Sequence, residues 1–386
     1  MSQDYIDYKN CKEKLTELFQ KRKVRSLFFV GKRWTRSLQV VDSIKLIAQK
    51  LNIEEIWFER FSSNPQYEEV AEGVSVFQKN RCQFIIAVGG GSAIDVAKCI
   101  KLFATMDSDI SYLKQKIVQN PIPLLAIPTT AGTGSEATRF AVIYHNEEKR
   151  SVSHDSGLPQ YVILDPHNVV SLPIYQKKVT LCDSLSHAIE SYWSIHSTAM
   201  SRRLAETSIK LILDNGEGYL ANQIKCCENM QKAANMAGQA INIAMTTAAH
   251  GMSYKLTTLF GIAHGHAVML CLPEVWEYML ANSDNCVDPR GLGYLQETLL
   301  KLAGCLRKHN SYEAVEFLKD LRKLLGLDIP QTAGKERIET LVESVNIERL
   351  RNFPVRLNVD NIRLIYGKIL RINNYECKGL FEGNRK

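Results

Sequence analysis

Short apolar runs alternate with segments of helical periodicity over the first half of this chain. Continuous apolar runs predict strands at residues 26–31, 54–61, 83–91 and 123–130. Between these runs, apolar residues recur three and four positions apart, which predicts helices at residues 37–51, from Pro65 to about Phe77, and at 92–104. Alternating strands and helices are typical of a mostly parallel sheet that is covered on both faces. We therefore predict an α/β fold for this half.

The pattern changes near residue 179, after the sequence SLP at 171–173. Helical periods then dominate, for example at 184–194, 205–215 and 229–250, and β-branched runs become scarce. A chain of 386 residues is too long for one ordinary core. We predict two domains, an α/β domain at 1–178 and an all-α domain at 179–386, with residues 378–386 as a loose tail.

Composition and charge exclude several classes of protein. Hydrophobic residues make up 45% and charged residues 23% of the chain, as in an average globular protein. The net charge is +7 but the basic residues are scattered, which argues against nucleic acid and suits a small anionic substrate or cofactor. The N-terminus is charged, and no apolar run is long enough to span a bilayer. The ten cysteines form no CxxC pair, so we expect reduced thiols in a cytoplasmic protein.

Three consecutive glycines stand between a predicted strand and a predicted helix. The motif is VGGGSAIDVAK, and its glycines are Gly89, Gly90 and Gly91. The first N–H groups of a helix and the positive end of its dipole attract an anion, and Ser92 can cap this helix or donate to a phosphate. A tight turn that needs glycines for steric reasons is the alternative. The motif favours a pyrophosphate site, although it is not the GxGxxG fingerprint of the ordinary Rossmann fold.

A second loop, IPTTAGTGSEAT at 127–138, follows the next predicted strand and is rich in hydroxyl groups. In an open α/β sheet, ligands bind at the carboxyl ends of the strands. A solvated turn is the ordinary alternative for one such loop. Two such loops on neighbouring strands indicate a single nucleotide-binding crevice.

Four candidate metal ligands lie on apolar helical segments of the second half. Asp183 and His187 are four residues apart and therefore share one helix face. By themselves they would more often form a structural pair, but His250 and His264 occur in similarly apolar surroundings. One site with three histidines and an aspartate is more economical than separate buried polar pairs, and it suits Fe²⁺ or Zn²⁺. Such a metal polarises a carbonyl or alkoxide, so a nucleotide crevice and a metal together predict hydride transfer.

The chain resembles the iron-containing (group III) alcohol dehydrogenases. GGGSAIDVAK, IPTTAGTGSEAT, ILDP, DSLSHAIESY and two HG pairs occur in the family's order between about residues 26 and 275. The resemblance implies a dehydroquinate synthase-like fold, with a dinucleotide-binding domain followed by a helical metal-binding domain. It implies metal binding by Asp183, His187, His250 and His264. It also implies contacts to NADH or NADPH from Gly89, Gly90, Gly91, Ser92, Asp95, Lys98, Thr129, Thr130 and Thr133.

Two positions depart from the pattern of this family. Tyr254 stands where many members carry a histidine for proton transfer, and a phenol, with an ordinary pKa of about 10, is a poorer relay near neutrality. Gly31 stands where several NAD-specific members carry an acidic residue, and Lys32 and Arg33 follow it. Loss of the carboxylate and gain of cations permit a 2′-phosphate, so NADPH is a candidate cofactor.

The segment HGMSYKLTTLFGIAHGHAVMLCLP is similar to one branch, the phosphonoacetaldehyde reductases. This similarity implies reduction of phosphonoacetaldehyde to 2-hydroxyethylphosphonate, with Lys255 as a cation for the phosphonate and Arg139 and His266 as further candidates. Alternatively, Lys255 extends to solvent and Arg139 pairs with Glu136 or another acid. A general short-chain alcohol dehydrogenase and a lyase of the dehydroquinate synthase type are the competing functions. We expect a homodimer or a higher homo-oligomer.

Overall fold

The computed structural model describes residues 3–146, 148–330, 335–345 and 347–371, so the predicted tail at 378–386 lies outside the described residues. The chain divides into two compact units. The first contains Met1–Ala188 and Arg203–Ile243, and the second contains Ile189–Arg202 and Ala244–Lys386. The domain boundary predicted near residue 178 stays a prediction.

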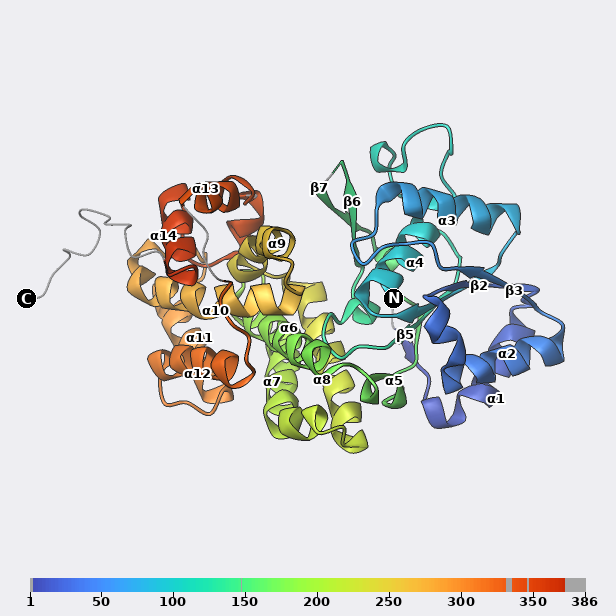
Figure 1. Ribbon diagram of the computed structural model, residues 1–386, viewed down its shortest axis with the longest axis horizontal. Helices are drawn as coiled ribbons and strands as arrows, with labels where there is room; N and C mark the ends of the chain where they lie inside the picture. Colours follow the sequence, from blue (N-terminus) through green and yellow to red (C-terminus); the bar gives the residue numbers. More distant parts are fainter. Residues whose placement is uncertain (1–2, 147, 331–334, 346, 372–386) are drawn as a thin grey trace, which may run out of the picture. The chain divides into compact units, whose positions relative to one another are not determined.

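A parallel sheet of six strands forms the centre of the first unit, in the order β1-β8-β5-β4-β2-β3 (Figure 1). The strands are β1 (Asp4–Tyr5), β2 (Ser26–Val30), β3 (Glu54–Phe58), β4 (Phe84–Gly89), β5 (Leu124–Pro128) and β8 (Tyr161–Val162). The helices between them are α1 (Cys11–Lys21), α2 (Gln39–Leu51), α3 (Tyr67–Lys79) and α4 (Gly91–Phe103). The predicted parallel α/β sheet is confirmed.

Each face of this sheet has its own hydrophobic core. Alternate strand residues such as Phe28 and Ile85 pack with Val74 of α3 and Ile94 of α4. Their neighbours along the strands, such as Phe29, belong to the core beneath α1 and α2. Figure 1 shows α1 and α2 on one side of the sheet and α3 and α4 on the other. Burial on both faces explains why these strands are near-continuous apolar runs in the sequence.

A β-hairpin that the hydrophobic pattern did not predict projects from this unit. Its strands, β6 (Phe140–His145) and β7 (Glu148–Ser153), pair antiparallel and form a separate two-stranded sheet. The hairpin follows the threonine-rich loop, and β6 also packs against α4. The hairpin therefore links the end of the threonine-rich loop to α4, the helix that follows the three glycines.

The C-terminal part of the chain, within the residues that the structure describes, is helical, as predicted. It contains α5 (His167–Val170), α6 (Ile174–Trp193), α7 (Ala199–Leu220), α8 (Ile224–Ala244), α9 (Ala248–Phe260), α10 (His264–Ala281), α11 (Leu292–Cys305), α12 (Ser311–Leu324), α13 (Lys335–Glu343) and α14 (Val359–Ile369). Among the described residues, every helix is too short or too polar to cross a membrane.

The segment 229–250, which has a helical period in the sequence, is divided between two helices. Helix α8 ends at Ala244, Met245 adopts a left-handed conformation with φ of 61°, and a new helix, α9, begins at Ala248. Gly261, also left-handed, ends α9 shortly before α10 begins at His264. Two candidate metal ligands, His250 and His264, therefore stand in the first turns of successive helices.

Candidate active site

The two predicted ligand-binding loops lie against each other. Strands β4 and β5 are neighbours, and Gly89 pairs with Pro128 where both strands end. A Cβ atom on Gly90 would lie 3.3 Å from Cγ2 of Thr130, and one on Gly91 would lie 3.0 Å from Cγ2 of Thr133. The sequence correctly predicted that these loops share one edge of the sheet, and side chains at Gly90 and Gly91 would crowd this junction.

Helix α4 presents its first turn to this junction. Its N-cap residue is Gly90, which has no side chain to accept bonds from the first N–H groups of the helix. The hydroxyl of Ser92 does not cap α4 but donates to the carbonyl oxygen of Ser63 at 2.5 Å. The backbone N–H groups and the positive end of the helix dipole are therefore the features that can hold a pyrophosphate here. Thr129 is buried, and its backbone N–H donates to the carbonyl oxygen of Gly89 at 3.0 Å.

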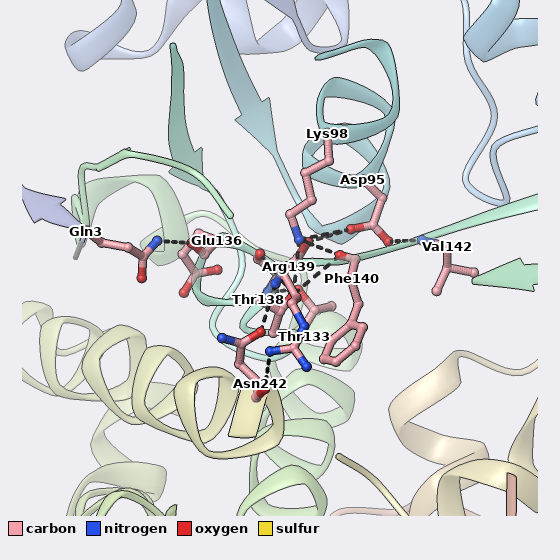
Figure 2. Close-up of polar contacts among 11 residues, drawn as sticks. Gln3, Asp95, Lys98, Thr133, Glu136, Thr138, Arg139, Phe140, Val142 and Asn242 are labelled. Atoms are coloured by element: carbon pink, nitrogen blue, oxygen red, sulfur yellow. Dashed lines mark hydrogen bonds and ion pairs between the residues drawn. The ribbon is translucent and has the colours of Figure 1, made fainter. Parts of the chain in front are cut away.

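Lys98, predicted to contact the cofactor, is fully buried and holds the threonine-rich loop from within (Figure 2). Its ammonium donates to the hydroxyl groups of Ser135 and Thr138 at 2.9 and 3.0 Å, and to the carbonyl oxygen of Phe140 at 2.6 Å. Burial lowers the pKa of Lys98, and the carboxylate of Asp95, 3.7 Å away, opposes this shift.

Asp95 belongs to the same network. One carboxylate oxygen accepts from the hydroxyl of Ser135 at 2.5 Å, and the other accepts from the backbone N–H of Val142 at 2.9 Å. Burial raises the pKa of Asp95, whereas the charge of Lys98 and these hydrogen bonds lower it. Both charged residues of the GGGSAIDVAK motif thus join α4 to the loop and to β6, as Figure 2 shows.

Gly31 lies at the end of β2, close to the backbone of β4. A Cβ atom there would lie 2.7 Å from both the carbonyl oxygen of Val88 and Oγ1 of Thr35. The ammonium of Lys32 donates to carbonyl oxygens beyond β3, and Arg33 is exposed. Of the two cations predicted to favour NADPH, Arg33 is therefore the more accessible.

Arg139, a candidate substrate residue, is held by the protein itself. Its guanidinium donates to the carbonyl oxygen of Asn242 at 3.1 Å and lies 3.8 Å from the carboxylate of Asp155. The pairing acid is Asp155, not Glu136, which accepts from the side chain of Asn235 at 3.0 Å instead. The contacts of Arg139 match the predicted structural alternative.

Asp183 and His187 stand one turn apart on α6, as their spacing predicted. Nε2 of His187 lies 4.0 Å from Oδ1 of Asp183, and both side chains are buried. Together with the buried His250, they form a group of side chains that could hold a metal ion. This group contains three of the four predicted ligands.

His264 is the fourth predicted ligand, and its ring lies beside that of His250. The two ring centroids are 5.4 Å apart. The ring of Tyr254 stacks on the other imidazole, that of His264, with centroids 5.6 Å apart and an interplanar angle of 10°. The phenol at the position of the missing histidine is thus next to a predicted ligand.

Sequence reasoning missed Glu190, which lies three residues after His187 on α6. Its fully buried carboxylate contacts Nδ1 of His250 and accepts from the backbone N–H groups of Thr247 and Ala249 at 3.1 and 2.9 Å. Burial would raise the pKa of Glu190, but His250 and these hydrogen bonds hold it below its ordinary value. A glutamate within an apolar helical segment was the available signal, because glutamate is rarely buried without partners.

The residues present fit a divalent transition metal. The carboxylate of Asp183 and the imidazoles of His187 and His250, all buried, are donors that Fe²⁺ and Zn²⁺ accept, and the fourth predicted ligand, His264, is half-buried. A histidine that binds a metal through one nitrogen commonly donates its other N–H to a carboxylate, and Glu190 stands in that position toward His250.

The two remaining substrate candidates, His266 and Lys255, differ in how deeply they are buried. His266 is buried on α10, and its Nε2 lies 2.9 Å from the carbonyl oxygen of Asp328. Burial lowers the pKa of this imidazole. Lys255 is half-buried on α9, one residue after Tyr254.

Known proteins resemble this chain over nearly its whole length. The family model "Iron-containing alcohol dehydrogenase" matches residues 2–166, and the model for the C-terminal part of the same family matches residues 178–369. The 1,3-propanediol dehydrogenase of Citrobacter freundii is 34% identical over 255 residues, which span 64% of this chain and 66%, just under two thirds, of that enzyme.

Two further relatives have names that specify charged aldehydes. The phosphonoacetaldehyde reductase of Streptomyces viridochromogenes is 28% identical over 302 residues, covering 75% of this chain and 76% of its own. The solved structure of sulfoacetaldehyde reductase from Bifidobacterium kashiwanohense, in complex with NAD⁺, is 25% identical with a TM-score of 0.82, covering 96% of this chain and 98% of that one. With its parallel sheet, its metal-binding group and both family models matched, this chain belongs to the iron-containing alcohol dehydrogenase family.

Proposed function

We propose that this protein is a metal-dependent, NAD(P)H-linked alcohol dehydrogenase that works as an aldehyde reductase, with phosphonoacetaldehyde as its substrate. The main support for this type of reaction is the buried group of Asp183, His187 and His250, which could hold a metal ion. The family models also match the chain from residue 2 to 369 with one short gap. In the proposed reaction the aldehyde, NAD(P)H and one proton give 2-hydroxyethylphosphonate and NAD(P)⁺.

The metal would be held by Asp183, His187, His250 and His264. When bound, Fe²⁺ or Zn²⁺ supplies a Lewis acid that polarises the carbonyl group of the substrate. The protein keeps Asp183, His187 and His250 buried, so that the charge of the carboxylate and the lone pairs of these two imidazoles act in a medium of low dielectric constant.

The nicotinamide cofactor would bind through the junction of the two loops. It supplies the hydride, and the backbone N–H groups at the start of α4 would hold its pyrophosphate. Thr130 and Thr133 stand beside Gly90 and Gly91, where their hydroxyl groups could donate to the same phosphates. Gly31 and the exposed Arg33 leave room for the 2′-phosphate of NADPH.

Tyr254 is the proposed proton donor of this site. Its ring stacks on His264, which places a phenol beside a predicted metal ligand. A tyrosine donates more slowly than a histidine near neutral pH, so water would share this role.

Recognition of an anionic aldehyde rests on Lys255 and on the two relatives whose names specify a phosphonate and a sulfonate. Lys255 is half-buried on the helix that carries His250 and Tyr254. A lysine ammonium has a flexible stem and three donors, which suits a phosphonate without fixing its orientation. We also propose a homodimer or higher homo-oligomer, which light scattering during size exclusion would test.

The first test is oxidation of NADPH and NADH by the anaerobically Fe²⁺-loaded protein, with phosphonoacetaldehyde beside propionaldehyde and glycolaldehyde. A strong preference for the phosphonate is expected. Faster oxidation of NADPH than of NADH would support the proposal that Gly31 permits a 2′-phosphate. Comparable rates with the neutral aldehydes would leave a general alcohol dehydrogenase. No net oxidation with any aldehyde would refute the dehydrogenase and favour a lyase.

Lys255→Met tests the anion site. Loss of a charge-assisted hydrogen bond costs about 1.5–3 kcal/mol, so KM for phosphonoacetaldehyde should rise about tenfold or more while KM for propionaldehyde stays the same. Lys79→Met, at an exposed position on α3, is the matched control and should change neither value. Equal effects of Lys255→Met on both aldehydes would show that Lys255 does not bind the phosphonate.

A further inference from the structure

The buried carboxylate of Glu190 accepts most of the hydrogen bonds at the start of α9. Glu190 Oε1 accepts from the backbone N–H groups of Thr247 and Ala249 at 3.1 and 2.9 Å, and from the hydroxyl of Thr247. Its Oε2 accepts from the backbone N–H of His250 at 3.3 Å and contacts Nδ1 of the same residue. Five donor groups from three residues, Thr247, Ala249 and His250, thus converge on a side chain that is 0% exposed.

Glu190 replaces the local cap of α9. The N-cap residue, Thr247, makes no capping bond with its own side chain. Its hydroxyl instead donates to Glu190 and accepts from Nε1 of Trp193 at 2.9 Å. A distant carboxylate therefore satisfies first-turn N–H groups that would otherwise be unpaired, and its negative charge suits the start of the helix.

The same carboxylate decides where His250 carries its proton. An ionised carboxylate can only accept hydrogen bonds, so the imidazole nitrogen that contacts it must be the protonated one. We infer that Glu190 is a positioning residue: it selects the Nδ1–H tautomer of His250 and so makes Nε2 the atom that binds the metal. This inference rests on the metal centre of the proposed function, and it assigns to Glu190 no contact with substrate or cofactor.

Glu190→Gln is a nearly isosteric way to disturb this arrangement. Three donors face Oε1 and only two face Oε2, so the amide oxygen should take the Oε1 side. The amide N–H₂ would then face His250, whose Nδ1 can accept from it only when the imidazole proton has moved to Nε2. A protonated Nε2 cannot bind a metal, so the substitution should change the tautomer and weaken metal binding together.

The tautomer can be read without metal or activity. Protein labelled with ¹⁵N-histidine, metal-free and at a pH of about 8, where an ordinary imidazole is neutral, reports which ring nitrogen is protonated. The signal of His250 is assigned by its loss in His250→Gln. We expect the Nδ1–H form in the wild-type protein and the Nε2–H form in Glu190→Gln. In competition with a chromophoric chelator, Zn²⁺ affinity should fall about 10–100-fold in Glu190→Gln.

Thr247→Val is the matched control, because it removes one donor to Glu190 and leaves the contact to His250. It should lower the melting temperature and leave the tautomer and the Zn²⁺ affinity unchanged. An Nε2–H form in the wild-type protein would overturn the inference, even if Glu190→Gln does not fold. An unchanged tautomer with unchanged Zn²⁺ affinity in Glu190→Gln would overturn it as well. If the wild-type protein binds no Zn²⁺ and no Fe²⁺, the proposed metal centre fails, while the tautomer still tests the role of Glu190.

Discussion

Replacement of Lys101 by methionine should stabilise the protein below pH 8. Lys101 lies on α4 with its side chain fully buried, and its ammonium has no hydrogen-bond partner among the residues that the structure describes. Burial lowers its pKa from the ordinary 10.5 to about 8. An ammonium that cannot be solvated or paired disfavours the folded state, and methionine fills a similar volume without a charge.

The size of this effect follows from linkage. Between pH 8 and 10.5 the unfolded chain binds a proton at Lys101 that the folded protein does not, so the stability of the wild-type protein rises with pH in this window. The difference between the two pKa values corresponds to about 3 kcal/mol at pH 7 and to less than about 1 kcal/mol at pH 10. Lys101→Met should therefore unfold with a free energy about 3 kcal/mol above that of the wild type at pH 7, and the gain should fall to less than about 1 kcal/mol at pH 10.

Urea unfolding at both pH values measures this gain. The quantity of interest is the difference between variant and wild type at each pH, because the titration of other groups cancels in it. Lys79→Met, at an exposed position, is the control and should change the free energy of unfolding by less than about 0.5 kcal/mol at either pH. A gain for Lys101→Met that is equal at pH 7 and pH 10 would show that packing, not the buried charge, is responsible.

Two other substitutions test the nucleotide-binding half. Lys98→Met should lower the free energy of unfolding by about 3–5 kcal/mol and raise KM for the cofactor, because it removes the cation beside the largely shielded carboxylate of Asp95 and releases the threonine-rich loop; urea unfolding and initial rates measure the two effects. Gly31→Asp should lower stability by about 1–3 kcal/mol without creating a preference for NADH, because its Cβ would meet the carbonyl oxygen of Val88; unchanged unfolding with a switch to NADH would contradict the geometry.

The central strands of the sheet, β2, β4 and β5, were predictable from the sequence because they are buried on both faces. All five residues of β2 are buried, so this strand is a near-continuous apolar run, which the sequence shows without any alternation of apolar and polar positions. The hairpin of β6 and β7 was not predictable in this way. Only Val152 of the sequence EKRSVS in β7 is buried, so propensity and pattern give little signal for a strand.

The break between α8 and α9 shows why the helical half was harder. Residues 229–250 keep a helical period, and neither proline nor glycine marks the interruption between Ala244 and Ala248. The interruption depends on distant partners: the hydroxyl of Ser194 donates to the carbonyl oxygen of Ala244 at 2.6 Å, and Glu190 accepts the first N–H groups of α9. Tertiary hydrogen bonds of this kind leave no local pattern in the sequence.

The GGGSAIDVAK motif illustrates a different limit of sequence reasoning, which concerns the role of a residue and not its position. The sequence placed Asp95 and Lys98 correctly in the helix after the glycine loop, and the resemblance implied that both contact the cofactor. In the structure, the ammonium of Lys98 already has three acceptors, and Asp95 accepts from Ser135 and Val142. A direct contact from Lys98 to a phosphate would require these bonds to break, whereas fixing the shape of the loop requires that they persist. Because both roles demand the same residue types at the same spacing, only the three-dimensional contacts distinguish them.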